Sequence, residues 1–137
     1  MQRYLGYAFS RPFGDFVMPV PAQNSCMREY VHRRDGLYIP PQLEHKFENC
    51  YMQLAGTISS SLAGDFIVIY SFEIIYLNFL KTLPFFRAAF LKSVTVCFVL
   101  ENFDVKSEVD LLQKYKMRNI RKFIISESEL IKRVLNL

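Results

Sequence analysis

The chain has 137 residues, a net charge of +4 and a hydrophobic fraction of 51%, which suits one folded domain and excludes a disordered chain. Its three cysteines (Cys26, Cys50 and Cys97) lack metal-ligand and redox spacing, so we expect neither disulfides nor a metal site. No signal peptide is visible, and the most apolar stretch, residues 66–80, is too short and polar to span a bilayer. We therefore expect one cytoplasmic domain over residues 1–137.

Strands and helices are predicted to alternate along the whole chain. In chain order they are a strand at Arg3–Phe9, a helix at Ala22–Arg34, a strand at Leu37–Ile39, a helix at Phe47–Leu62, a strand at Phe66–Tyr70, a helix at Leu77–Lys92, a strand at Val94–Leu100, a helix at Ser107–Lys116, a strand at Ile120–Ile125 and a helix at Leu130–Leu137. This alternation predicts a three-layer α/β domain, with helices on both faces of a mainly parallel sheet of about five strands.

Polar residues follow two of the predicted strands. Ser10 and Arg11 end the first strand, and Ser71 and Glu73 follow the buried run of the third. Ligands of parallel sheets bind outside the carboxyl ends of the strands, and an arginine there can hold a phosphate or carboxylate through two hydrogen bonds. We therefore predict a binding site at this edge, the alternative being an ordinary turn with a surface salt bridge.

The first predicted helix and the segment after it add further candidates. Gln23 and Asn24 fall in the first turns of the helix, where free N–H groups favour an anion, and Arg28 shares a face with Asn24. These residues equally suit helix capping and a solvated face. Glu44 follows the Pro40-Pro41 bend and could serve as a general base, as a partner for an arginine, or as a surface carboxylate. No glycine-rich phosphate loop is present, so we expect no nucleotide cofactor.

Two stretches resemble the catalytic domain of serine resolvases. They are Leu5-Gly6-Tyr7-Ala8, followed by Ser10, and Gly64-Asp65-Phe66-Ile67-Val68-Ile69. The resemblance implies a resolvase-like fold, which is close to the flavodoxin-like arrangement. It does not carry over the chemistry, because Phe9 and Arg11 occupy the places of the family's strand-end arginine and nucleophilic serine. Without an arginine cluster to stabilise phosphoryl charge, we expect no strand cleavage.

A longer set of motifs resembles the small bacterial sporadic carbohydrate cluster proteins, whose genes lie among those for surface polysaccharides such as lipopolysaccharide O-antigen. The motifs are Gly6-Tyr7-Ala8-Phe9-Ser10-Arg11-Pro12-Phe13, Val20-Pro21-Ala22-Gln23-Asn24, Met27-Arg28-Glu29-Tyr30, Glu44, Cys50-Tyr51-Met52-Gln53-Leu54 and Ile69-Tyr70-Ser71-Phe72. This resemblance implies a role in carbohydrate biosynthesis without naming a reaction.

The leading hypothesis is a protein that binds or processes a sugar or sugar nucleotide. In it Arg11, Arg28, Gln23, Asn24, Tyr70 and Ser71 bind the ligand, while Glu44 and Ser10 are the catalytic candidates. A second hypothesis is a non-catalytic interaction subunit that binds a partner carbohydrate enzyme or a second copy. A third hypothesis is a nucleic-acid module that uses the basic residues between Lys114 and Arg133. It is ranked last because no aromatic stacking motif lies among these basic residues.

Overall fold

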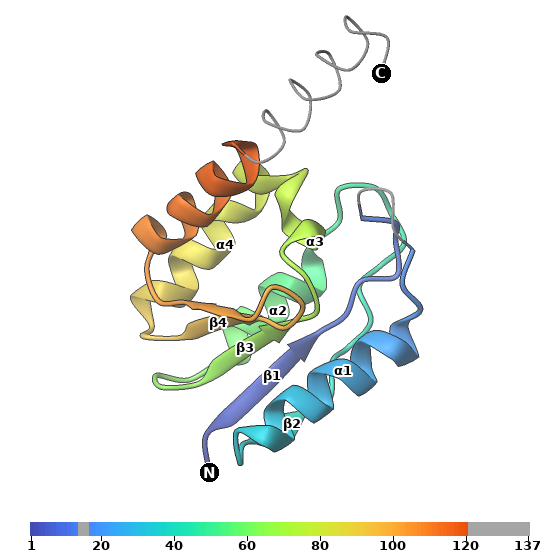
Figure 1. The fold of residues 1–137 in the computed structure, drawn as a ribbon, viewed down its shortest axis with the longest axis vertical. Coiled ribbons are helices and arrows are strands. Elements are labelled where there is room, and N and C mark those ends of the chain that lie inside the picture. The colour runs from blue at the N-terminus through green and yellow to red at the C-terminus, as the bar shows by residue number, and fades with distance from the viewer. Residues whose placement is uncertain (14–16, 121–137) are drawn as a thin grey trace, which may run out of the picture.

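The computed structural model describes residues 1–13 and 17–120 (Figure 1). Its elements are β1 (Arg3–Tyr7), α1 (Val20–Arg33), β2 (Leu37–Ile39), α2 (Met52–Ser60), β3 (Phe66–Ile69), α3 (Glu73–Tyr76), α4 (Phe79–Leu91), β4 (Thr95–Phe98) and β5 (Phe103–Val105). Residues 108–120 form a further helix.

The strands form one sheet in the order β2-β1-β3-β4-β5, parallel except for β5, which pairs antiparallel with β4. In Figure 1, α1 lies on one side of this sheet, and α2 and α4 lie on the other. The predicted α/β class, with a mainly parallel sheet and helices on both faces, is confirmed. The strand order reverses between β1 and β3, and in such sheets this switch point is where ligands bind.

Alternation along β1 divides the core into two parts. Tyr7 faces α2 and α4 and joins the larger cluster, in which Phe86 of α4 is fully buried. Tyr4 faces α1 and packs with Met27 and Val31. The helix at 108–120 belongs to the larger cluster, because Leu111 is fully buried there and the Tyr115 ring stacks on Phe79 at 4.1 Å. Both faces of the central strands are therefore packed, as the apolar run of β3 predicts.

The prediction missed one strand near the C-terminal end and was wrong about the residues around Ile120. The edge strand β5 was not predicted, since its three residues form a strand only by pairing with β4. Ile120, predicted to begin a strand, is helical, and the helix predicted to end at Lys116 continues to residue 120. The rest of the strand at Ile120–Ile125 and the helix at Leu130–Leu137 lie outside the described residues.

Two predicted helices differ from the observed ones at their first residues. The helix expected from Phe47 begins at Met52, because residues 45–50 are held in an irregular path by Arg11 and Glu44, as described below. The helix expected from Leu77 is observed as α4, which begins at Phe79 and holds Pro84 inside it rather than at a break; the short helix α3 that precedes it was not predicted.

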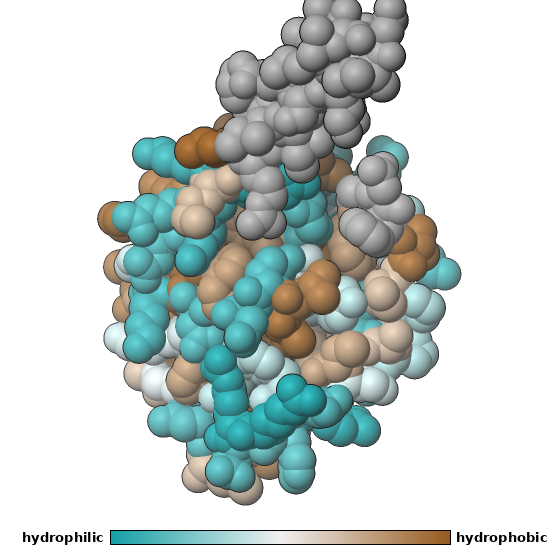
Figure 2. Space-filling model, viewed as in Figure 1, coloured by the Kyte–Doolittle hydropathy of each residue, from teal (hydrophilic) through white to brown (hydrophobic). Residues whose placement is uncertain are grey.

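Hydrophilic and hydrophobic residues are interspersed over the face shown in Figure 2. In the part of the chain that the structure describes, no helix is both long and apolar enough to cross a membrane.

Candidate functional site

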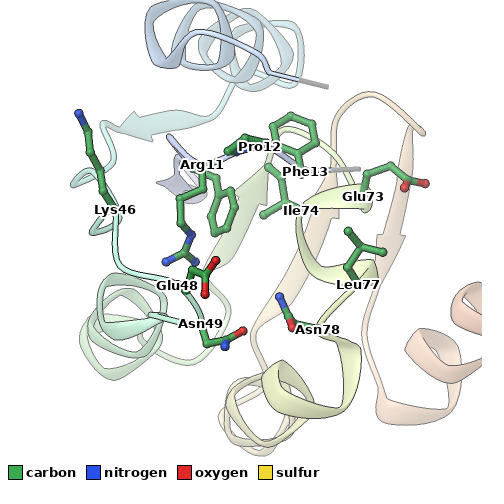
Figure 3. Close-up of a pocket in the computed structure, with 11 residues that line it drawn as sticks. Arg11, Pro12, Phe13, Lys46, Glu48, Asn49, Glu73, Ile74, Leu77 and Asn78 are labelled. Atoms are coloured by element: carbon green, nitrogen blue, oxygen red, sulfur yellow. The ribbon is translucent and has the colours of Figure 1, made fainter. Parts of the chain in front are cut away.

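A cleft of about 450 Å³ opens at the carboxyl ends of β1 and β3 (Figure 3). Its lining residues follow β1, follow β3, or belong to the segment before α2: Phe9, Arg11, Pro12, Phe13, Lys46, Glu48, Asn49, Glu73, Ile74, Leu77 and Asn78. The cleft therefore occupies the switch point of the sheet, and its volume lies in the range of small-ligand sites, roughly 300–1,000 Å³.

Arg11 is the central cation of this cleft. Its Nη1 donates to the carbonyl oxygens of His45, at 3.1 Å, and Phe47, and its Nη2 donates to that of Cys50 at 2.8 Å. The guanidinium also lies over the Phe9 ring, 4.3 Å from the centroid. Among the described residues no carboxylate forms an ion pair with Arg11. Its positive charge is thus held at the cleft by neutral groups, which leaves it able to attract an anion.

Two asparagines bring amide groups to the same cavity. Figure 3 shows Asn49 and Asn78 on the side of the cavity opposite Pro12 and Phe13. Asn78 donates to the Tyr51 hydroxyl at 2.9 Å, and Asn49 makes no side-chain hydrogen bond to any residue in the described ranges. Asn49 has a φ of 58°, a left-handed conformation that asparagine tolerates better than most residues. The cleft therefore offers amide donors and acceptors beside a cation.

The acidic residues of the cleft differ in their surroundings. Glu73 is bound by Arg118, with Nε to Oε1 at 2.5 Å, and the same hydrogen bond raises the pKa of Arg118. In Figure 3 the Glu73 carboxylate points away from the cavity, whereas Glu48, which is exposed, is drawn between Arg11 and Asn49. Lys46 stands at the outer rim, with its ammonium group directed away. Glu48 is therefore the carboxylate best placed to bond a ligand.

Glu44 is buried, with 1% of its surface exposed, and it caps α2. Its Oε1 accepts from the backbone N–H groups of His45, at 3.0 Å, and Gln53, at 3.2 Å, while Oε2 accepts from the Tyr7 hydroxyl at 2.8 Å and the Leu54 N–H at 3.2 Å. Gln53 and Leu54 lie in the first turn of α2, whose N–H groups have no partner inside the helix. Burial, with the nearby Glu44 carboxylate, raises the pKa of Tyr7 far above its usual range.

Three predicted binding residues lie away from the cleft. The Gln23 side chain is fully buried and pairs with the backbone of Phe9, accepting from its N–H at 3.1 Å and donating to its carbonyl at 2.7 Å. Asn24 accepts a hydrogen bond from the Tyr38 hydroxyl at 2.7 Å, and the exposed Arg28 lies over the Tyr38 ring, 5.8 Å from its centroid. Gln23 thus fixes the end of β1, and the other two lie on the solvent side of α1.

The remaining predicted residues are close to the cleft but do not line it. The Ser10 hydroxyl oxygen is inaccessible to solvent and has no hydrogen-bond partner in the described part of the chain. The Tyr70 ring packs edge-on against Phe13 at 6.3 Å, and Ser71 donates to Glu101 at 2.8 Å. Of the residues predicted to bind a ligand or to catalyse, Arg11 alone lines the cavity; Glu73, noted only as a polar residue after the third strand, lines it as well.

Sequence reasoning missed Lys46, Glu48, Asn49 and Asn78. The first three belong to the mostly polar run His45-Lys46-Phe47-Glu48-Asn49 that follows the Pro40-Pro41 bend, and the helix predicted from Phe47 concealed this signal at Glu48 and Asn49. Asn78 lies between α3 and α4, in a break that the sequence pattern did not indicate.

Comparison with known proteins supports the fold. No family model matches the chain, and no curated protein matches it. The structure is similar to that of a resolvase family site-specific recombinase from Streptococcus pneumoniae, with a TM-score of 0.54 and 13% sequence identity over 97% of this chain and 99% of that one. The predicted resolvase-like fold is thereby confirmed. Identity this low shows the fold alone, and the resemblance to carbohydrate cluster proteins stays a prediction.

Proposed function

We propose that the protein binds a small anionic sugar derivative, a sugar phosphate or a nucleotide sugar, in the cleft at the ends of β1 and β3, and serves bacterial surface carbohydrate biosynthesis. The observation that carries this proposal is the position of Arg11 in a cavity of about 450 Å³ at the switch point of the sheet. Among the described residues Arg11 bonds backbone carbonyls and forms no ion pair with a carboxylate. The carbohydrate pathway rests on the sequence resemblance.

The chemistry of the lining suits such a ligand. Arg11 supplies positive charge for a phosphate, and the amides of Asn49 and Asn78 can bond sugar hydroxyls as donors and acceptors. Glu48 accepts hydrogen bonds from hydroxyls, and Phe13 adds an apolar wall. Ligand sites usually combine a few convergent polar groups with apolar surface in this way.

The proposal is for binding rather than a named reaction. A general acid–base must come within hydrogen-bond reach of the proton that it transfers, and the 1% exposure of Glu44 keeps its carboxylate from a ligand. The Ser10 hydroxyl is likewise inaccessible. Their catalytic roles stay predictions, while their surroundings are those of a helix cap and a buried strand end.

Thermal denaturation in the presence of sugar phosphates and nucleotide sugars tests the proposal. A ligand at a hundred times its dissociation constant stabilises the fold by about 2.7 kcal/mol, a shift that is easily measured. Asn49→Gly removes a cleft amide without disturbing the left-handed backbone, and should weaken binding about fivefold to tenfold. Asn102→Gly is the matched control, because Asn102 has nearly the same φ, 57°, in the turn between β4 and β5.

Three outcomes would contradict the proposal. One is the absence of stabilisation by any anionic sugar. Another is equal weakening of binding by Asn49→Gly and Asn102→Gly, which would place the ligand elsewhere. The third is stabilisation by neutral sugars that Asn49→Gly weakens as much as it weakens stabilisation by anionic sugars, which would remove the role of Arg11.

Nucleic-acid binding is the second candidate, and the resolvase-like fold favours it. Residues 108–120 carry Lys114, Lys116 and Arg118, but Arg118 is paired with Glu73. Phe9 and Arg11 stand where the serine resolvases have their strand-end arginine and nucleophilic serine, so this candidate is limited to binding without cleavage. Titration with duplex DNA at low and high salt tests it, since phosphate contacts make the affinity fall steeply with added salt.

A further inference from the structure

A second concave surface lies on the α2 side of the sheet, and we refer to it as the α2 groove. It has a volume of about 360 Å³ and shares no lining residue with the cleft. Its floor is apolar, formed by Leu5 of β1 and Ile39 of β2, which are register partners in the parallel pair. Leu5 is buried and Ile39 is partly exposed, so the exposed part of this floor comes mainly from Ile39.

The polar side chains around this floor are amides and hydroxyls. Gln42 lies at one side, and Gln53, Thr57 and Ser60 lie along α2 at the other. The Thr57 hydroxyl donates to the Gln53 carbonyl at 2.8 Å and the Ser60 hydroxyl to the Thr57 carbonyl at 3.1 Å, so both oxygens present lone pairs as acceptors. The glutamine amides supply donors. None of the described residues that line the groove carries a charge.

Gly56 lies in the middle of α2 and faces the same groove. Glycine is the least favourable helix residue apart from proline, and one of its uses is to let a ligand approach the backbone closely. Apart from the two neighbouring residues and the backbone of α2 itself, no atom of the described residues lies within 4 Å of the position that a Cβ on Gly56 would take. The missing side chain therefore makes no room for a neighbour within the fold, and it leaves the groove open beside the helix backbone.

From these two independent observations, the uncharged polar lining over an apolar floor and the unfilled space at Gly56, we infer that the α2 groove is a binding site for a neutral saccharide. A sugar ring offers hydroxyls that both donate and accept, which matches the amides and hydroxyl oxygens, and a C–H face that suits Leu5 and Ile39. A charged ligand finds no counter-ion here. The inference does not rest on the function proposed for the cleft.

The experiment is a titration of ¹⁵N-labelled protein with glucose, galactose, N-acetylglucosamine and maltose, followed by amide chemical shifts. We expect shifts at the backbone of residues 53–60 and at the Gln42 and Gln53 side-chain amides. Gly56→Leu fills the groove and should weaken binding at least about tenfold while raising the melting temperature. Ser59→Leu, at an exposed position of α2 that does not line the groove, is the control and should bind as the original protein does.

Several results would overturn the inference. They are the absence of shifts with all four sugars and shifts confined to the cleft at Asn49 and Asn78. Unchanged binding by Gly56→Leu would also overturn it. Because the probes are neutral and the variant lies outside the cleft, failure here is distinguishable from failure of anionic binding in the cleft.

Discussion

Replacing Glu44 by glutamine should destabilise the fold strongly, because it removes a buried cap while preserving volume. The two carboxylate oxygens together accept hydrogen bonds from three backbone N–H groups and the Tyr7 hydroxyl. In Glu44→Gln, one oxygen becomes an NH₂ group that faces donors, and because each oxygen accepts two of these bonds, two charge-assisted bonds are lost in either orientation of the amide. At about 1.5 kcal/mol for each such bond, we expect a loss of about 3 kcal/mol from the free energy of unfolding.

Urea denaturation followed by far-UV circular dichroism measures this loss. The control is Glu48→Gln, the same substitution at an exposed position of the same segment, which should stay within about 0.5 kcal/mol of the original protein. If Glu44→Gln also unfolds within about 0.5 kcal/mol of the original protein, the carboxylate does not cap α2 as described. That result would favour the catalytic role predicted for Glu44 over the capping role.

Three further predictions concern Arg11, Gly56 and the buried tyrosines. Arg11→Lys should cost about 2 kcal/mol in urea denaturation, because an ammonium group cannot reproduce the planar fork that bonds three carbonyls, and an unchanged midpoint would refute this. Gly56→Ala should raise the free energy of unfolding by about 1 kcal/mol in thermal denaturation, since its Cβ meets nothing within 4 Å, and a loss would contradict the helix geometry. Alkaline pH should unfold the protein, because burial raises the pKa of Tyr38 to about 12 and that of Tyr7 further. Below pH 10 both the folded and the unfolded chain hold these protons, and the stabilisation is fully present. As the pH rises from 10 toward 12 the unfolded chain loses its protons first, and this stabilisation is lost. A circular dichroism signal that stays constant to about pH 12 would contradict that expectation.

The sheet was predictable because its central strands carry their own signals. Residues 66–69 form a continuous apolar run that is buried on both faces, and β1 and α1 are bounded by prolines and a glycine. β5 had no such signal, since three residues form a strand there by pairing with β4. The helix at Ser107 was also predictable, because the Ser107 hydroxyl accepts the Asp110 N–H at 3.2 Å, as a capping sequence predicts.

The site was predictable in its location and less so in its residues. A strand-end cation was expected at Arg11, and it does line the cleft. The roles of Gln23 and Glu44 depend on partners far along the chain, since Gln23 bonds Phe9, 14 residues away, and Glu44 caps a helix that begins at Met52. Local pattern cannot show that a polar side chain is consumed by the fold in this way. Buried polar residues therefore resembled site residues in the sequence.

The most direct test of the central claim is to locate an anionic sugar on the protein. Titration of ¹⁵N-labelled protein with glucose 1-phosphate and with a uridine diphosphate sugar should shift the backbone amides of residues 46–49 and 73–78, which line the cleft around Arg11. The neutral sugar without its phosphate should leave those amides unchanged. Absence of shifts at the cleft with either phosphorylated ligand, or equal shifts with the neutral sugar, would contradict the proposed function.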